Sequence, residues 1–289
     1  MNIRDLKYVV ALKDHLHFGH AAAACHVSQP ALSGQIAKLE ARLGVALFER
    51  SKKAVRITPV GAKIAARAEA LLLIANEIES VARAATDPRS GPFRLGMIAT
   101  IGPYLAPRIL GEVHRLLPAL TLTLVEGMTH DLEAQLEAGQ LDAIVQATLP
   151  RSTALAQQPL YEEPFLVALP NGHPLAAKPR IRLSEIPEAE LLLLADGHCL
   201  RDQVLGACGA NGASVNTRET SLETLLALVA AGDGITLLPA MAARAGPLML
   251  KPVAGTGAAR QVCLVHRQSF PHPEVIEALA VIIRKAGHG

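Results

Sequence analysis

The sequence predicts an α+β multidomain protein: a small helical N-terminal domain, one long helix, and a two-lobed α/β domain. Two observations predict this organisation. Apolar residues recur at helical spacing through the first 85 residues, and apolar strands alternate with helices from residue 93 onward. The chain has 289 residues, of which 50% are hydrophobic and 19% charged, so a globally disordered protein is excluded.

The N-terminal segment predicts three short helices. The first covers residues 3–14 and the second, rich in alanine, covers residues 18–25. Ser28 is placed to cap a third helix, which has Pro30 in its first turn and ends at Gly44. Two helices joined by a short turn form a helix-turn-helix arrangement.

A basic hairpin and a long helix follow. Residues 46–59 predict a short hairpin, or wing, and Thr58-Pro59 begins a helix that runs to about residue 85. Its apolar residues recur at alternating spacings of four and three, which is typical of a coiled coil between two subunits. An ordinary amphipathic core helix is the alternative. The apolar positions are Ile64, Ala68, Leu71, Ala75, Ile78 and Ala82. Residues 87–92 predict a linker.

The charge distribution indicates that the N-terminal domain binds nucleic acid. Residues 1–58 carry nine basic and four acidic side chains, a net charge of +5, whereas the remainder carries −3. Short polar side chains near the start of the third helix are candidates to read base edges: Ser28, Gln29, Pro30, Ser33 and Gln35. Candidates for phosphate or minor-groove contacts are Lys38, Arg50, Lys52, Lys53 and Arg56. The alternatives are a helix cap for Ser28, a solvated Gln35 and a merely solvated basic face.

From residue 93 onward strands and helices alternate, which implies parallel sheets with helices on both faces. Strands are expected at residues 93–98, 120–125, 143–147, 164–168, 191–194, 235–238 and 261–265. Helices are expected at 105–116, 132–137, 200–208, 222–231 and 274–285. A restart of the pattern near residue 164 suggests two lobes. The expected domains are 1–58, 59–90 and 91–289, with lobe I at 91–163 plus 268–289 and lobe II at 164–267.

The cysteines do not form a disulfide scaffold, because four in a chain of this length are too few. Neither a signal peptide nor a membrane span is apparent, so a cytoplasmic protein is expected. Cys25 and Cys263 lie in apolar surroundings and are expected to be buried and inert. Cys199 follows the turn Asp196-Gly197 at the start of a predicted helix, where backbone N–H groups, His198 and Arg201 would lower the pKa of its thiol.

The spacing of Cys199 and Cys208 poses a geometric problem. In a helix, nine residues separate them by roughly 13 Å, whereas a disulfide needs Cα atoms less than about 7 Å apart. Either Cys208 is inert or oxidation forces the segment to refold. Four glycines in or beside the segment reduce the strain of refolding: Gly197, Gly206, Gly209 and Gly212.

Several motifs resemble one known family. The motif FGHAA at residues 18–22 and VSQPALS at 27–33 resemble the helix-turn-helix of LysR-type transcriptional regulators, as do LFER at 47–50 and TPVG at 58–61. The C-terminal part resembles the peroxide-sensing members of that family. This resemblance rests on DGHCLRDQ at 196–203 with Cys208 nine residues after Cys199, and on TIGPYL, TSLETL and GITLLP at 100–105, 220–225 and 234–239.

The resemblance implies a regulatory domain like that of periplasmic binding proteins and a redox-active pair, Cys199 and Cys208, whose disulfide refolds the domain. It also implies a peroxide-binding pocket that is lined by Thr100, Thr129 and His198, with Arg267 nearby. The alternatives are a helix cap for Thr129 and an ordinary surface position for Arg267. The expected partners are double-stranded promoter DNA, hydrogen peroxide as the signal, and further copies of this chain in a dimer or tetramer. RNA polymerase is a further candidate partner, and no membrane, metal or cofactor is expected.

Three other functions compete with this one. A regulator of the same family could sense a small metabolite in the cleft between the lobes, with idle cysteines. A thiol peroxidase would need no basic DNA-binding domain, which argues against an enzyme. A metal-responsive regulator could use His15, His17 and His20 with Cys25, but these histidines straddle a predicted helix boundary rather than sharing one face.

Overall fold

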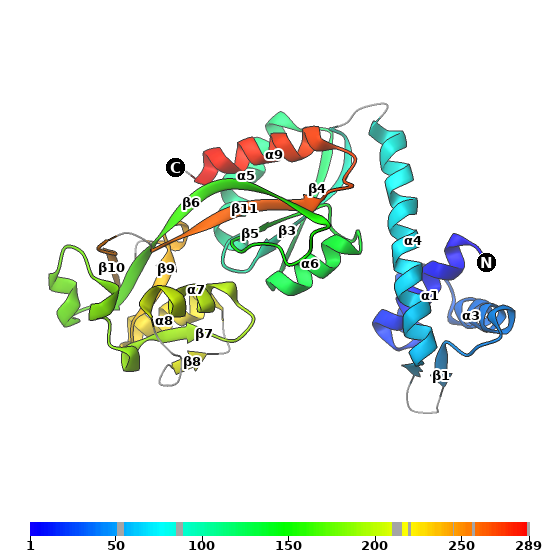
Figure 1. Ribbon diagram of the computed structural model, residues 1–289, viewed down its shortest axis with the longest axis horizontal. Coiled ribbons are helices and arrows are strands. Elements are labelled where there is room, and N and C mark those ends of the chain that lie inside the picture. The colour runs from blue at the N-terminus through cyan, green and yellow to red at the C-terminus, as the bar shows by residue number, and fades with distance from the viewer. Residues whose placement is uncertain are drawn as a thin grey trace. The chain divides into compact units, whose positions relative to one another are not determined.

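The structure, a computed structural model, describes residues 1–50, 55–84, 89–209, 216–218, 221–244, 246–255 and 258–287. The chain divides into two compact units, Met1–Ala82 and Arg83–Gly289 (Figure 1). Each unit is described by itself.

The N-terminal unit contains the predicted helix-turn-helix. Its elements are α1 (Ile3–His15), α2 (Phe18–Ala24), α3 (Gln29–Leu43), β1 (Phe48–Arg50), β2 (Val55–Ile57) and α4 (Pro59–Ala84). The Ser28 side chain caps α3 by accepting a hydrogen bond from the N–H of Ala31, and α3 ends at Gly44 in the left-handed conformation, as predicted. Leu12 of α1, Ala21 of α2 and Leu32 of α3 are fully buried and lie in one small core that joins the three helices.

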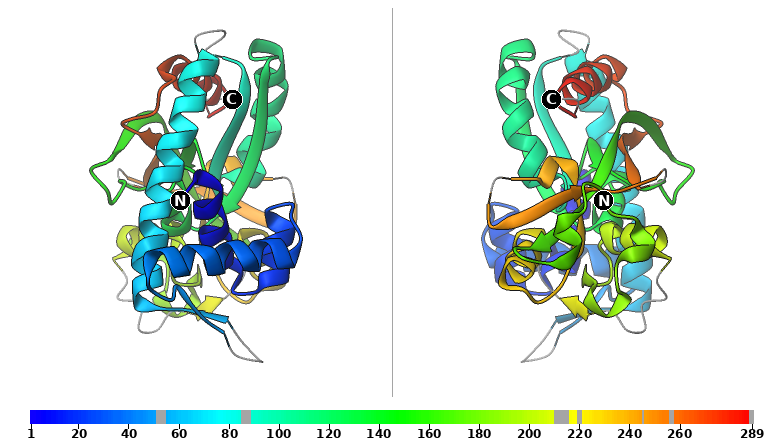
Figure 2. Two further views of the ribbon diagram at one scale, coloured as in Figure 1. Left: turned by 90° about the vertical axis from the view of Figure 1, so that its right-hand side faces the viewer. Right: turned by 90° about the vertical axis from the view of Figure 1, so that its left-hand side faces the viewer.

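The predicted wing is also present. Strands β1 and β2 pair antiparallel and project from the unit beside the start of α4 (Figure 2). The Thr58 hydroxyl donates to the carbonyl of Ala46 and accepts from the N–H of Gly61, which joins the hairpin to α4. A side chain at position 61 would overlap the carbonyl oxygen of Leu47, so this contact requires glycine.

Apolar residues of α4, a helix of 26 residues, are buried near its start and exposed farther along. Near its start, Ala65 and Ala68 are buried against the helix-turn-helix. Farther along, Leu71, Ile74 and Ile78 are 49%, 53% and 67% exposed. The repeat of apolar residues therefore continues beyond the point at which the unit's own core ends, as expected of a helix that pairs with another copy.

The C-terminal unit is built on a seven-stranded sheet. Its strands are β3 (Gly91–Ile98), β4 (Leu120–Gly127), β5 (Ala143–Gln146), β6 (Leu155–Pro170), β9 (Thr236–Pro239), β10 (Leu248–Pro252) and β11 (Ala259–Arg267). The strand order is β10-β6-β11-β5-β3-β4, and β9 also pairs with β6. A separate pair is formed by β7 (Leu192–Leu194) and β8 (Asn216–Arg218). The helices are α5 (Gly102–Leu116), α6 (Thr129–Glu137), α7 (Cys199–Cys208), α8 (Leu222–Ala231) and α9 (Pro273–Gly287).

The expectation of parallel sheets is only partly correct. Strand β3 pairs parallel with β4 and β5, but β11 runs antiparallel to both β5 and β6. The physical reason is that β6 and β11 carry the chain from one lobe to the other and back, so they run in opposite directions (Figure 1). The expected break at residue 164 lies inside β6, and β8 and β10 were not anticipated.

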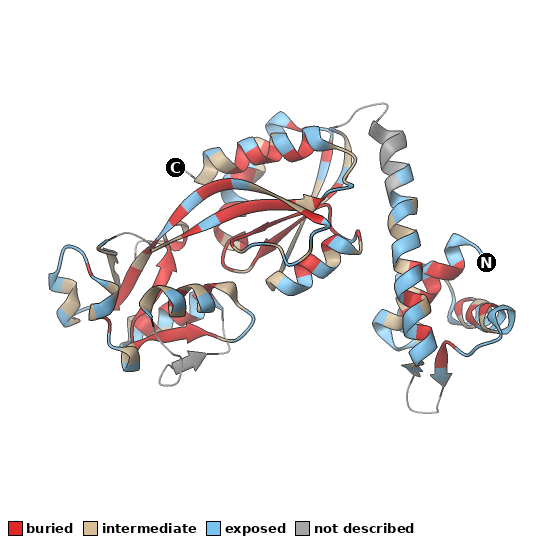
Figure 3. Cartoon of the chain, viewed as in Figure 1, coloured by how far each residue is buried: buried red, intermediate tan, exposed pale blue. Residues whose placement is uncertain are grey.

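The two lobes have separate cores. Figure 3 shows the buried residues running along β6 and β11 into both lobes. The first cluster joins β3, β4 and β5 to α5, α6 and α9, and the second lies around β7, α7 and α8. Val262, Cys263, Leu264 and Val265 of β11 belong to the first cluster, so this part of the strand packs in the first lobe, whereas it was expected in the second.

The fold places two strand ends opposite the start of α7. Strands β3 and β4 are parallel neighbours, so their carboxyl ends lie at the same edge of the sheet and are followed by Thr100 and Thr129. Ligands commonly bind at this edge of α/β sheets. Among the described residues, no helix is long and apolar enough to cross a membrane.

Candidate functional site

A tight turn presents Cys199 at the first position of α7. Strand β7 ends at Leu194, and Gly197 turns the chain with a φ of 94°, which favours glycine. His198 is the N-cap and Cys199 begins the helix. The Cys199 sulfur accepts a hydrogen bond from the N–H of Leu200. The sequence-based placement of Cys199 at the start of a helix is therefore correct.

Cys199 closes a very small polar pocket. Residues 98–100, 127–129 and 197–199 line it, and Thr100, Thr129 and His198 supply its polar side chains. The space measures about 10 Å³, which is about the minimum for one water-sized molecule. Three of the four residues expected to bind peroxide thus meet beside the thiol. A metabolite the size of a sugar or an amino acid does not fit in this pocket.

The surroundings of the thiol raise its pKa, whereas the sequence predicted that they lower it. Burial raises the pKa of Cys199 above its ordinary value, and this effect outweighs the positive charge of Arg260 and the hydrogen bonds from the Thr129 hydroxyl and the Leu200 N–H. Burial lowers the pKa of His198, which leaves its ring neutral at pH 7. Arg201 forms an ion pair with the exposed Asp196 at 2.8 Å, so its charge is directed to the surface.

Arg260 is the cation of this site, and the sequence reasoning missed it. Its guanidinium donates to the Thr100 hydroxyl at 2.9 Å, to the Thr100 carbonyl at 3.0 Å and to Glu163 at 2.8 Å. Arg260 and Glu163 are almost completely buried, with side-chain exposures of 1% and 3%. Glu163 in turn accepts a hydrogen bond from the N–H of Met241. The network holds the Thr100 hydroxyl at the pocket and directs a positive charge toward the thiol.

The structure does not bring Arg267 to the pocket. Its guanidinium donates to the carbonyl of Leu136, in the last turn of α6, and to that of Leu141, which follows the helix. It lies 5.8 Å from the centroid of the Phe270 ring. Arg260 and Arg267 are both on β11, seven residues apart, and only Arg260 pairs across the sheet with Glu163.

Cys208 lies at the far end of α7 and faces different surroundings. The helix is intact from Cys199 to Cys208, and both thiols are free. Cys199 packs on the first hydrophobic cluster, whereas Cys208 packs on the second. Burial raises the pKa of the Cys208 thiol. The structure is therefore the dithiol form, and its helix keeps the two sulfurs apart.

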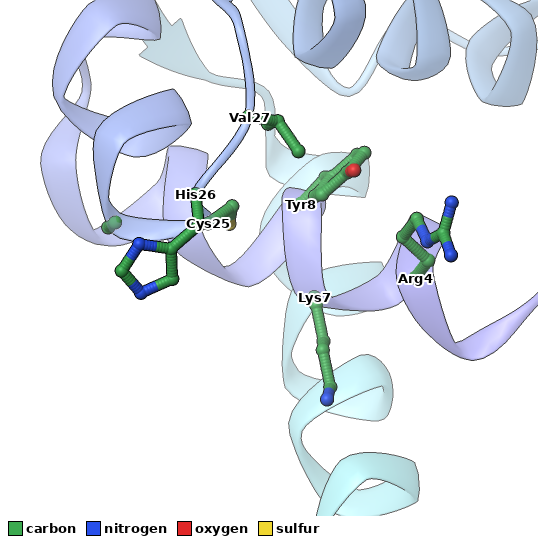
Figure 4. A pocket seen from close by; sticks show the side chains of 7 residues that line it. Arg4, Lys7, Tyr8, Cys25, His26 and Val27 are labelled. Atoms are coloured by element: carbon green, nitrogen blue, oxygen red, sulfur yellow. The ribbon is translucent and has the colours of Figure 1, made fainter.

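The other two cysteines differ from each other. Cys263 is 1% exposed in the core of the first lobe, and Gln157 donates to its sulfur. Cys25 is only half-buried, contrary to expectation. It lies in a hollow of about 720 Å³ whose rim carries Arg4, Lys7 and His26 (Figure 4). None of these basic side chains is among the DNA contacts predicted from the sequence.

The candidate DNA-contact residues are mostly exposed. Ser28, Gln29, Pro30, Lys38 and Arg56 are exposed, and Ser33 is half-buried. Gln35 instead donates to Asp5 at 2.7 Å and joins α3 to α1, so its amide is used inside the unit. Lys52 and Lys53 lie outside the described residues, as does the side chain of Arg50.

One of the histidines considered as metal ligands, His17, serves another purpose. The Nδ1 atom of His17 accepts from the N–H groups of Gly19 and His20 and so caps α2. Within the described parts of the chain, no group of three or more His, Cys, Asp or Glu side chains is arranged to hold a metal ion.

Comparisons with known proteins identify the family. The profile of the LysR substrate binding domain matches residues 86–287, and that of the bacterial regulatory helix-turn-helix protein, lysR family, matches residues 3–62. The chain belongs to the LysR family.

Curated relatives are similar over nearly the whole chain. The hydrogen peroxide-inducible genes activator of Pectobacterium carotovorum subsp. carotovorum is 44% identical, over 100% of this chain and 98% of the relative. The DNA-binding transcriptional dual regulator OxyR of Escherichia coli K12 is 44% identical, over 98% and 95%.

Two solved structures extend this similarity. A full-length OxyR variant from Pseudomonas aeruginosa matches with a TM-score of 0.80 and 41% identity, over 98% of this chain and 95% of that chain. A hydrogen peroxide-bound OxyR variant from Corynebacterium glutamicum matches with a TM-score of 0.66 and 34% identity, over 99% and 92%.

The raised pKa of Cys199 predicts how its oxidation by peroxide depends on pH. Only the thiolate reacts well, so the rate should increase about tenfold per pH unit and keep rising beyond about pH 8.5. Thr129→Val removes a hydrogen bond that favours the thiolate, so at pH 7 it should slow oxidation on the order of tenfold.

Stopped-flow kinetics from pH 6 to 9 would measure both effects. Thr123→Val, a similar change at an exposed position of β4, should leave the rate unchanged. A rate that is already constant above pH 6 would show that the thiol is ionised in the folded protein and would contradict this account.

Proposed function

We propose that this chain is a DNA-binding transcription regulator that senses hydrogen peroxide through oxidation of Cys199 and a disulfide between Cys199 and Cys208. The observation that carries the proposal is the pocket of about 10 Å³, in which a thiol, two hydroxyl groups and an imidazole meet. The names of the relatives, which describe peroxide-inducible gene activators, support the same assignment.

In the first step, the Cys199 thiolate attacks one oxygen of hydrogen peroxide. The O–O bond breaks, the sulfur becomes a sulfenic acid, and the other oxygen leaves as hydroxide, which takes up a proton to form water. The hydroxyl groups of Thr100 and Thr129 are placed to bind the two oxygens. The positive charge of Arg260 stabilises the negative charge that develops on the leaving oxygen.

In the second step, the Cys208 thiolate attacks the sulfur of the sulfenic acid. The S–S bond forms, the S–O bond breaks, and the oxygen leaves as water after taking up a proton. The sulfurs cannot meet while α7 is intact, because a ten-residue helix separates its end Cα atoms by roughly 13 Å. The reaction therefore requires the helix to unwind.

The size of the pocket favours peroxide, rather than a metabolite, as the molecule that binds beside the Cys199 thiol. A pocket that admits one water-sized molecule selects by size against larger ligands. Among the oxidants that fit, hydrogen peroxide has the weak O–O bond that a thiolate can break.

The N-terminal unit supplies the DNA-binding function. Gln29 and Ser33, at the start of α3, are in the positions from which a recognition helix reads base edges. Lys38 and Arg56 are exposed and positively charged, as are Arg4 and Lys7 at the hollow beside the turn that precedes α3. A helix in the major groove has phosphates on both sides, so these side chains are candidates to contact them.

The exposed apolar face of α4 supports self-association. Leu71 and Ile78 are one heptad apart and largely exposed, and a second copy of α4 would bury them. A dimer would carry two DNA-binding units and so would bind two half-sites.

The thiol assignment predicts distinct results for three cysteine variants. Cys199→Ser should abolish the response to peroxide, because no sulfenic acid can form at the pocket. Cys208→Ser should leave a sulfenic acid on Cys199 that dimedone traps and mass spectrometry detects. Cys263→Ser is the control and should respond like the wild type. Loss of the response in this control, with a normal response in Cys199→Ser, would mean that the wrong thiol has been assigned.

The DNA assignment predicts that two kinds of substitution act differently. Lys38→Gln and Arg4→Gln should each reduce the slope of log affinity against log salt concentration by about one unit, equally on specific and nonspecific DNA. Gln29→Ala should instead cost on the order of 1–3 kcal/mol on the specific site alone.

Fluorescence anisotropy with both DNAs at several salt concentrations measures these effects. Lys251→Gln, on β10 of the C-terminal unit, makes the same change in net charge and should leave the slope unaltered. If Gln29→Ala weakened both DNAs equally, its assignment to base reading would be wrong.

A further inference from the structure

Helix α7 packs against both lobes, one with each of two faces. Leu200 and Val204 are buried in the cluster of the second lobe. Cys199 and Gln203 are four residues apart, so they lie one above the other on another face. Cys199 packs on the first lobe and is hydrogen-bonded to the Thr129 hydroxyl. The same face of the helix thus carries the reactive thiol and an amide side chain.

Gln203 reaches across to the first lobe. Its Nε2 donates to the carbonyl oxygen of Ala147 at 2.7 Å. Ala147 directly follows β5 and is buried in the first cluster. This hydrogen bond holds the second turn of α7 against the same lobe that supplies Thr100 and Thr129. It therefore fixes the helix, and with it the sulfur, relative to the pocket.

The amide oxygen of Gln203 limits how much this side chain stabilises the dithiol form. Gln203 Oε1 is buried and has no hydrogen-bond partner in the part of the chain that the structure describes. A buried acceptor without a partner destabilises the state that contains it. The dithiol form thus gains one hydrogen bond and bears one unsatisfied oxygen. The Gln203–Ala147 hydrogen bond therefore positions α7 in the dithiol form but adds little to the free energy needed to unwind the helix.

We propose that Gln203 is a positioning residue of the peroxide switch. It holds Cys199 at the pocket in the dithiol form, and its hydrogen bond to Ala147 breaks when α7 unwinds and the Cys199–Cys208 disulfide forms. This inference rests on the proposed function, because it requires that disulfide. In this proposal, Gln203 shifts the equilibrium between the two forms toward the helical dithiol form.

The effect on the redox equilibrium has a definite sign. Gln203→Met keeps the length and apolar stem of the side chain and removes both the donor and the unpartnered Oε1. The Ala147 carbonyl loses this donor, so one unsatisfied buried oxygen replaces another, and the net change is the loss of the hydrogen bond, which weakens the dithiol form. The disulfide form, in which this hydrogen bond is already broken, is not weakened. The equilibrium constant for disulfide formation should rise on the order of fivefold. For this two-electron couple, that corresponds to a midpoint potential about 20 mV more negative. Closure of the disulfide after sulfenic acid formation should accelerate by up to the same factor.

The experiment uses the full-length protein. The fraction of disulfide is measured by thiol alkylation and mass spectrometry in dithiothreitol redox buffers, and closure is followed by quenched flow after a pulse of hydrogen peroxide. The matched control is Gln157→Met. Gln157 is another glutamine with a buried, unpartnered Oε1, but it is on β6 and donates to Cys263 instead of joining α7 to the first lobe. Its midpoint potential should equal that of the wild type.

The result that supports the inference is a more negative potential and faster closure in Gln203→Met but not in Gln157→Met. Equal potentials in all three proteins would overturn it while leaving the peroxide-sensing proposal intact. If the wild type forms no Cys199–Cys208 disulfide, the proposed function fails and this inference fails with it. Should Gln203→Met fold poorly, Gln203→Ala provides the same comparison, because alanine is the strongest helix former and α7 would be retained.

Discussion

The length of α7 is the constraint on which the rest of the switch depends. A helix of ten residues holds Cys199 and Cys208 roughly 13 Å apart, about twice the separation that a disulfide tolerates. The two thiols also pack on different hydrophobic clusters, one in each lobe. Joining them therefore requires both the loss of helical hydrogen bonds and a change in packing between the lobes. A redox reaction at one sulfur is converted in this way into a conformational change of the domain.

A buried network around Arg260 holds the Thr100 side of the pocket in place. Two buried charges are costly unless both are paired and hydrogen-bonded. Here the guanidinium bonds Glu163 and Thr100, and Glu163 also accepts from the N–H of Met241. The network joins β6, β11 and the start of α5 at the pocket. Burial keeps the pKa of Cys199 high, and Arg260 partly offsets that effect. We infer that the selectivity for peroxide comes from the size of the pocket and from the groups that bind the leaving oxygen, rather than from a thiol that is always ionised.

Local signals in the sequence predicted much of the fold and part of the site. Ser28 and Gly44 define the limits of α3, and the turn at Gly197 places Cys199 at the start of α7, because caps and turns depend on neighbouring residues. Arg260 could not be found in this way. Its role depends on the pairing of β11 with β6, which sets it opposite Glu163 from a distant part of the chain. The sequence did not predict β6 as a single long strand, because its first half pairs with β11 and its second half with β9 and β10, which lie elsewhere in the chain. Gln35 resembles a base-reading side chain in the sequence, and only the packing of α1 against α3 reveals its bond to Asp5.

The unwinding of α7 is the central claim, and amide hydrogen exchange measures it most directly. In the dithiol form of the full-length protein, backbone amides within α7 should be protected from exchange. They are hydrogen-bonded within an intact helix, and Leu200 and Val204 are buried in the second cluster. After oxidation by hydrogen peroxide, the account predicts that these amides lose their protection, while those of α5, in the first lobe, keep theirs. Unchanged protection of the amides between Cys199 and Cys208 in a fully oxidised sample would contradict the account.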